Sequence, residues 1–325
     1  MKSTLWSRTT AYRFSEDDSN SLSPEQKQLE ALIRSGEAND SNLHRYSDQY
    51  FLENISTIRQ NLLEWIAFDK TGNVLELDAK SGLMTELLCA RFGHVTAVIP
   101  DAGDAYLNFL RNKSHNNLDI RTCHADGVGA PFADGTVSET EGSKNGSDLF
   151  DAVTLTGIDA FFIDGLFPEL KNENDPDQKL GVLLSFVHSC LDDQGQLILA
   201  VNNRLGIQYW SGNVDRCSDK IFDNVCGNIS GQKEYSFSKK ALTKILSEEK
   251  FCDISFYYPI PDYRFPQEIF SDSRLPNPGD VRPVSVNYEK DHYQLFDEKM
   301  AIDSLCKDGL FDQFANSYLV LCRKG

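Results

Sequence analysis

The residues of this chain best suited to chemistry follow one another in VLELDAKSGLMTELL, residues 74–88. A short apolar run contains an acid, Glu76, and the turn from Asp78 to Gly82 leads into residues that favour a helix. Glycine in such a turn lets a ligand approach the backbone, and the helix behind it offers unpaired N–H groups. The pattern therefore indicates a site for a nucleotide-type cofactor, although two of the glycines expected in such a turn are missing.

Alternating strands and helices surround this turn. Apolar, β-branched runs occur at 74–77, 94–100, 118–126, 150–158 and 196–202, with helical patterns near 82–92, 102–113 and 179–191 between them. The last residues, SYLVLCRKG, form a further strand pattern. Strands that alternate with helices predict a parallel sheet covered on both faces. We expect an α/β fold: a Rossmann-like, doubly wound, mostly parallel sheet of about seven strands with an antiparallel last strand.

One main domain and a polar N-terminal extension are expected. Residues 1–45 are rich in serine and acidic residues, and Ser23 could begin a helix there. The main domain should span 46–325, with weakly patterned insertions near 203–236 and 259–292. A chain of 325 residues is long enough to bury a sizeable core in such a domain.

Composition narrows the classes of partner. The formal net charge of −17 argues against a sequence-independent nucleic-acid binder, which neutralises phosphates with Lys and Arg. The eight cysteines are scattered without a close pair, so no metal site is expected and free thiols in a reducing compartment are favoured. The sequence shows neither a run of about 18 apolar residues nor the apolar core of a secretory signal. We expect a cytoplasmic protein without a membrane span.

Longer strings resemble a known enzyme family. GNVLELDAKSGLMTELLCARFGHVTAVIPD is similar to the first strand, turn, helix and second strand of class I S-adenosylmethionine-dependent methyltransferases, and DLFDAVTLTGI and LDDQGQLILAVNN resemble their fourth and fifth strands. ISTIRQNLLEW, NNRLGIQYWSG and FYYPIPDYRFPQEIFSD more narrowly resemble bacterial methyltransferase domains associated with cell-surface polysaccharide glycosyltransferases. The resemblance implies S-adenosylmethionine as cofactor, a small-molecule or glycan acceptor such as a sugar precursor, and a glycosyltransferase as partner.

The same resemblance implies cofactor-binding residues at the carboxyl ends of the strands, where open parallel sheets bind ligands. These residues are Glu76 on the first strand, Asp78, Ser81 and Gly82 in the turn, Asp101 after the second strand, Asp126 and Gly127 after the third, and Thr156 and Gly157 after the fourth. Three positions depart from the family pattern. Asp78 and Lys80 stand where glycine is usual, and Ile99 stands where the second strand usually ends in an acid. A side chain at a glycine position costs on the order of 1 kcal/mol or more.

Candidates for acceptor binding and catalysis lie beyond the fifth strand and in the later insertion. The candidates for binding a sugar ring, through hydrogen bonds and aromatic faces, are Asn203, Arg204, Tyr209, Trp210, Tyr258 and Tyr263. An acceptor hydroxyl needs a base for its proton, and the candidates are Asp262 and His124. Each of these residues also has a plainer interpretation as a packed or turn-forming side chain.

Two functions from different classes stay open. The first is transfer of a methyl group from S-adenosylmethionine to an oxygen or nitrogen of a surface-glycan precursor. The second is a degenerate, non-catalytic module that serves as a partner-binding scaffold for a glycosyltransferase system, which Asp78, Lys80 and Ile99 motivate. A dinucleotide dehydrogenase is disfavoured because GxGxxG is absent from the turn, and P-loop chemistry because GxxxxGK is absent from the sequence.

Overall fold

A computed structural model describes residues 8–46, 48–123, 149–214, 220–227, 234–282 and 292–325. The strands are β1 (Thr9–Ala11), β2 (Asn73–Leu77), β3 (His94–Ile99), β4 (Leu118–Cys123), β5 (Phe150–Thr156), β6 (Leu191–Asn202), β7 (Phe251–Ile260), β8 (Glu268–Ser271) and β9 (Ser317–Lys324). The α-helices are α2 (Pro24–Ser35), α3 (Gln49–Ile55), α4 (Asn61–Glu64), α5 (Leu83–Arg91), α6 (Ala102–Asn112), α7 (Ala160–Leu166), α8 (Pro176–Cys190), α9 (Ile207–Trp210), α10 (Asp223–Cys226), α11 (Lys239–Glu248), α12 (Glu298–Lys307) and α13 (Phe311–Phe314). Short 3-10 helices are η1 (Glu16–Ser21), η2 (Asp40–Arg45), η3 (Thr57–Gln60) and η4 (Pro168–Leu170).

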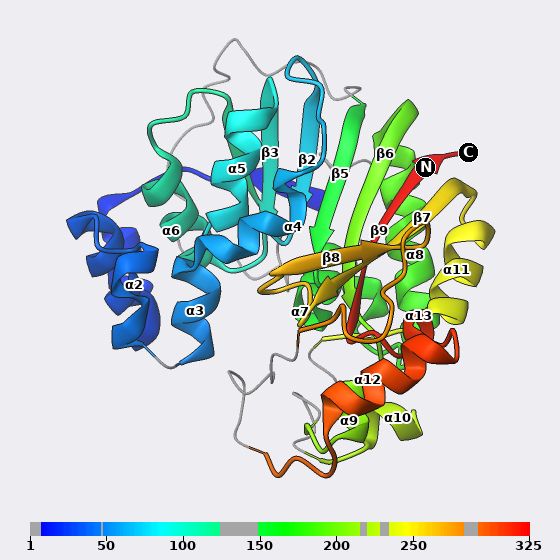
Figure 1. Cartoon of the computed structure of the whole chain (residues 1–325). Coiled ribbons are helices and arrows are strands. Elements are labelled where there is room, and N and C mark those ends of the chain that lie inside the picture. The colour runs from blue at the N-terminus through cyan, green and yellow to red at the C-terminus, as the bar shows by residue number, and fades with distance from the viewer. Residues whose placement is uncertain (1–7, 47, 124–148, 215–219, 228–233, 283–291) are drawn as a thin grey trace.

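The described strands form one nine-stranded sheet in the order β1-β4-β3-β2-β5-β6-β9-β7-β8 (Figure 1). From β4 to β6 neighbouring strands are parallel, and the direction in which the chain adds strands reverses between β2 and β5. β9 is antiparallel to both β6 and β7. The predicted Rossmann-like fold with an antiparallel last strand is therefore confirmed, and β1 and β8 add to its two edges.

Both faces of the sheet are buried, which explains why its strands read as almost continuous apolar runs. On β2, Val74 packs with Leu88 of α5 on one face, whereas Leu75 and Leu77 belong to the large core formed with α7, α8 and α11 on the other. Successive strand residues point to opposite faces, so one short run serves both layers. Figure 1 shows the helices on either side of the sheet.

The N-terminal segment attaches to the β4 side of the sheet. β1 pairs antiparallel with β4, and α2 packs against α6 through Leu29, Leu32 and Tyr106. α2 begins at a capping box in which Ser23 and Gln26 each accept a hydrogen bond from the other's backbone N–H. The extension therefore lies beside the carboxyl end of β3, next to the first turn of α6 (Figure 1).

Candidate functional site

A cavity of about 480 Å³ opens beyond the carboxyl ends of β2 and β5. Doubly wound sheets bind ligands at this reversal of strand order, and the volume is that of a small-molecule site. Its walls come from α3, the turn after β2, the loop after β5 and the loop after β7. The lining residues are Gln49, Tyr50, Glu53, Asn54, Arg59, Asp78, Lys80, Asp104, Thr156, Gly157, Ile158, Asp159, Val214, Glu234, Tyr263 and Arg264.

The turn after β2 keeps the backbone of a glycine-rich turn, although only one of its three residues with positive φ is glycine. Asp78, Lys80 and Gly82 all have positive φ, at 55°, 48° and 87°. Such angles cost a non-glycine residue about 1–3 kcal/mol, and lysine lacks the local hydrogen bonding that helps aspartate. At Gly82 a side chain has no room, since its Cβ would lie 2.5 Å from Nδ2 of Asn112 and 2.6 Å from Cγ of Asn108.

Polar side chains of α6 hold this strained turn. Asn112 donates to the carbonyl of Gly82 at 3.0 Å, and Asn108 donates to the hydroxyl of Thr85 at 2.9 Å. Arg111 donates through Nε to the carbonyl of Ser81 at 3.2 Å, and the Ser81 hydroxyl bonds the side chain of Asn54. Sequence reasoning missed this support. The sequence AYLNFLRNK could have predicted it, because Asn108 and Asn112 are four residues apart and therefore lie on one face of the helix.

Glu76 lies behind the turn, buried on the α5 side of β2. Its Oε2 accepts a hydrogen bond of 2.6 Å from the Thr85 hydroxyl. Burial is the main influence on this carboxyl and raises its pKa to about 8, against the lowering effect of Thr85. Glu76 is therefore protonated at neutral pH, and it does not belong to the lining of the large cavity.

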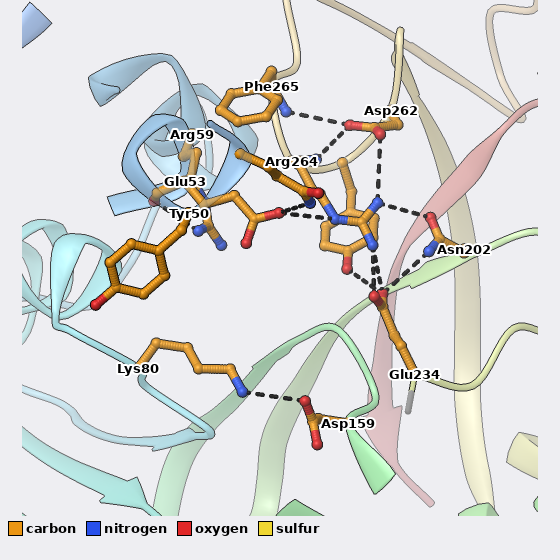
Figure 2. A network of polar contacts seen from close by, with 12 residues as sticks. Tyr50, Glu53, Arg59, Lys80, Asp159, Asn202, Glu234, Asp262, Arg264 and Phe265 are labelled. Carbon is orange, nitrogen blue, oxygen red and sulfur yellow. Dashed lines mark hydrogen bonds and ion pairs between the residues drawn. The ribbon is translucent and has the colours of Figure 1, made fainter. Parts of the chain in front are cut away.

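Lys80 crosses from the β2 turn to the β5 loop. Its Nζ lies 2.8 Å from Oδ2 of Asp78 and 3.3 Å from Oδ2 of Asp159. Burial lowers the pKa of Lys80, but the two carboxylates outweigh burial and raise the pKa above its usual value, so the ammonium stays charged. Figure 2 shows the side chain extended toward Asp159, below the network around Arg264.

The end of β3 is organised around a helix cap. Ile99 is buried, and Asp101 caps α6 by accepting from the backbone N–H of Asp104 at 2.8 Å. Gln26 of α2 donates through Nε2 to Asp101 at 2.8 Å and to Asp104 at 3.1 Å. Burial and the neighbouring Asp101 raise the pKa of Asp104 to about 6.

A buried ionic network forms the opposite wall (Figure 2). The Arg264 side chain is 3% exposed and its Nη2 donates to both oxygens of Glu234, at 2.8 and 2.6 Å. Its Nε lies 3.4 Å from Glu53 of α3. Tyr263 donates to Glu234 at 2.6 Å, and its hydroxyl would lie 2.9 Å from a Cβ placed on Gly157. Glycine at position 157 therefore permits the Tyr263 hydroxyl to reach the end of β5.

The structure brings together some of the predicted site residues. Asp78, Thr156, Gly157 and Tyr263 line the cavity, whereas Ser81 and Gly82 border a small recess beside it, and Asp101 caps α6. His124, Asp126 and Gly127 lie outside the described residues.

The predicted base Asp262 is fully buried beside the network. Its Oδ1 accepts from the backbone N–H of Arg264 at 2.8 Å, and its Oδ2 lies 3.4 Å from Arg264 Nη1. This placement gives Asp262 a role in shaping the loop after β7, and it is not among the residues that line the cavity. Its role as a base stays a prediction.

The other acceptor candidates are placed away from the cavity. Asn203 is buried and donates to the carbonyls of Gln313 and Ala315, both at 2.8 Å, and Arg204 follows it in the loop beyond β6. Tyr258 lies in the core, where its hydroxyl bonds Lys239 at 2.7 Å and also Asp272. Tyr209 and Trp210 belong to α9, and Trp210 Nε1 donates to the carbonyl of Leu205 at 3.2 Å. Of the four aromatic residues expected to form a wall for a sugar ring, only Tyr263 lines the cavity.

Charge is the main chemical property of the cavity. Its carboxylates belong to Glu53, Asp78, Asp104, Asp159 and Glu234, and its cations to Arg59, Lys80 and Arg264. Among the described lining residues the acids outnumber the bases, so a ligand with a positive centre is favoured over an anionic one. Gln26, Glu53 and Arg59 were not predicted, because only the tertiary fold brings α2, α3 and η3 to this edge of the sheet.

The described residues include neither a cluster that could hold a metal ion nor a helix that could cross a membrane. Among these residues, no group of three or more His, Cys, Asp or Glu side chains is arranged to hold a metal ion. No helix in the same ranges is long and apolar enough to cross a bilayer.

Comparisons with known proteins return distant matches to solved methyltransferases. No protein-family model and no curated protein matches the sequence. Phosphoethanolamine N-methyltransferases 2 and 1 of Haemonchus contortus, both solved with S-adenosylhomocysteine, match with 15% and 11% identity over 82% and 93% of this chain, with TM-scores of 0.42 and 0.46. A SAM-dependent methyltransferase of Archaeoglobus fulgidus matches with 15% identity over 85% of this chain and all of its own, with a TM-score of 0.44. The chain spans about half of the two Haemonchus proteins, 52% and 50%.

Proposed function

We propose that the chain is an S-adenosylmethionine-dependent methyltransferase whose cofactor site is the cavity between the β2 turn and the β5 loop. The observation that carries this proposal is a cavity of about 480 Å³ at the reversal of strand order, whose described lining residues include more carboxylates than cations. Such a lining suits a sulfonium ion, and the position is the one at which doubly wound sheets bind nucleotide ligands.

Several residues of the chain suit this ligand. The turn around Gly82 begins α5, whose first N–H groups are not paired within the helix. Asp78 and Asp159 provide negative charge, whereas Arg59 could pair with a carboxylate on the ligand. When bound, S-adenosylmethionine supplies an activated methyl group. The protein's part is then to hold donor and acceptor in line in a site shielded from water.

The acceptor that we propose is a hydroxyl or amine of a sugar or cell-surface polysaccharide precursor, with a glycosyltransferase as partner. Support comes from the resemblance of ISTIRQNLLEW, NNRLGIQYWSG and FYYPIPDYRFPQEIFSD to methyltransferase domains of such systems. The polar wall of Glu234 and Tyr263 suits an acceptor rich in hydroxyl groups. An amine acceptor is also compatible with the acidic lining.

Isothermal titration calorimetry with S-adenosylmethionine and S-adenosylhomocysteine tests cofactor binding. Gly157→Ala should weaken it, because the new Cβ meets Tyr263 at the cavity wall. Gly279→Ala is the matched control: Gly157 and Gly279 have similar φ, 102° and 91°, but the space around Gly279 is open. Absence of heat with both ligands at millimolar concentration would refute the proposal.

A non-catalytic scaffold is the second candidate. It is favoured because acids that line the cavity are already paired within the chain: Asp78 and Asp159 with Lys80, and Asp104 with Gln26. The triple variant Asp78→Gly, Lys80→Gly, Ile99→Asp discriminates between the two functions. Cofactor binding that appears only in this variant would favour the scaffold, and binding by the unaltered chain would favour the enzyme.

A further inference from the structure

The Lys80 ammonium takes up a position inside the cavity that a positively charged ligand would favour. It lies between two carboxylates, 2.8 Å from Asp78 and 3.3 Å from Asp159, which belong to loops after different strands. Its side chain is 43% exposed and lines the cavity, so it is not locked into the core. The chain thus places one of its own cations between the acids of its candidate ligand site, and Figure 2 shows its contact with Asp159.

Asp78 gives a second, independent indication of a ligand at this point. Its side chain is 2% exposed, and Lys80 pairs with Oδ2 only. Oδ1 is buried and has no hydrogen-bond partner, although the residue lines the cavity. A buried carboxylate oxygen without a partner is costly, and a donor or cation on a ligand would relieve that cost.

The backbone makes the position of Lys80 unusual for its residue type. At φ 48° it occupies a conformation that glycine adopts without strain and lysine does not. The strain is tolerated while α6 holds the turn, since Asn108 donates to the carbonyl of Lys80 at 3.3 Å. The turn after β2 therefore places both its backbone and the positive charge of Lys80 at the cavity.

We propose that Lys80 is a built-in counter-cation that sets how strongly the site prefers S-adenosylmethionine over S-adenosylhomocysteine. This inference rests on the proposed function. The two ligands share the adenosine and the amino-acid tail, and they differ by the methyl group and its positive sulfonium charge. The single positive charge of Lys80 offsets one of the two negative charges of Asp78 and Asp159, so the additional charge of the donor gains less than it would without Lys80. Lys80 therefore keeps the affinities for donor and product close together.

The test measures Kd for both ligands in the unaltered chain, in Lys80→Met and in Lys244→Met. Lys80→Met removes the charge with little change in side-chain length, and the ratio of the two affinities should shift toward S-adenosylmethionine by about tenfold or more, equivalent to about 1.4 kcal/mol. Lys244→Met is the matched control. Its side chain is 73% exposed in an ion pair with Glu248 on α11, so the ratio should not change.

A second variant works in the opposite direction and leaves the strained turn intact. Asp159→Asn removes one of the two acids, so any preference for the sulfonium ligand should fall below that of the unaltered chain. An unchanged ratio in both variants would overturn the inference. So would equal losses of affinity for both ligands in Lys80→Met, because that result would assign Lys80 to the shared carboxylate tail. If no variant binds either ligand, the proposed function itself fails and the inference fails with it.

Discussion

The buried carboxyl of Glu76 makes a quantitative prediction about stability and pH. In the folded chain its pKa is about 8, whereas an exposed glutamate has a value of 4.5. Between these values the unfolded chain has lost the proton that the folded chain retains, so stability falls as the pH rises. At about 1.4 kcal/mol per pKa unit, the free energy of unfolding should fall by roughly 4–5 kcal/mol across this window.

Glu76→Gln tests this reasoning, because a neutral amide replaces a carboxyl that is already neutral when folded. Its oxygen can still accept from Thr85, and it has no proton to lose. The difference in the free energy of unfolding between the variant and the unaltered chain should therefore rise in favour of the variant by about 4 kcal/mol from pH 5 to pH 8. Below pH 4.5 this difference should not change further.

Urea denaturation followed by circular dichroism at pH 5, 6, 7 and 8 measures the difference. Glu86→Gln is the matched control, since Glu86 is exposed on α5 and its effect should not vary in this way. A Glu76→Gln difference that stays constant from pH 5 to 8, or that grows toward low pH, would show that Glu76 is ionised in the folded chain.

Two other perturbations concern the walls of the cavity. Arg264→Met should destabilise the chain by about 3–5 kcal/mol in urea denaturation, because it removes a buried cation that pairs with Glu53, Glu234 and the buried Asp262. Combining it with Glu234→Gln should recover part of that loss, and strictly additive effects would contradict the network. Gln26→Ala should raise the affinity for S-adenosylmethionine about three- to tenfold in calorimetry, since it frees the carboxylate of Asp101 from a hydrogen bond worth about 0.5–1.5 kcal/mol. Unchanged affinity would show that Asp101 does not contact the ligand.

The fold could be predicted from the sequence because each strand and helix of a doubly wound sheet has its own pattern of apolar residues within a short segment. Each buried strand appears as a short apolar run, and helical spacing fills the intervals between strands. The turn at Asp78–Gly82 could be located for the same reason, and its departures from glycine directed attention to Lys80. The order of the strands and the added edge strands β1 and β8 depend on pairing between distant segments.

The walls of the cavity were harder to predict, because their roles depend on contacts remote in sequence. Tyr258 and Tyr263 lie in one aromatic stretch, yet Tyr258 is in the core and Tyr263 lines the cavity. Alternation along β7 does not extend into the loop after it, so no periodic rule separates them. Gln26 reaches Asp101 across 75 positions of the chain, a pairing that no local pattern encodes.

The two outermost strands protect the sheet against self-association. β1 has three residues and β8 has four, and short border strands offer few free backbone groups to another molecule. β1 covers β4, whose Arg121 also donates to the Thr9 hydroxyl at 2.8 Å. A chain trimmed of its first 45 residues would uncover residues 121–123 of β4, with which β1 pairs, and its tendency to aggregate should rise accordingly.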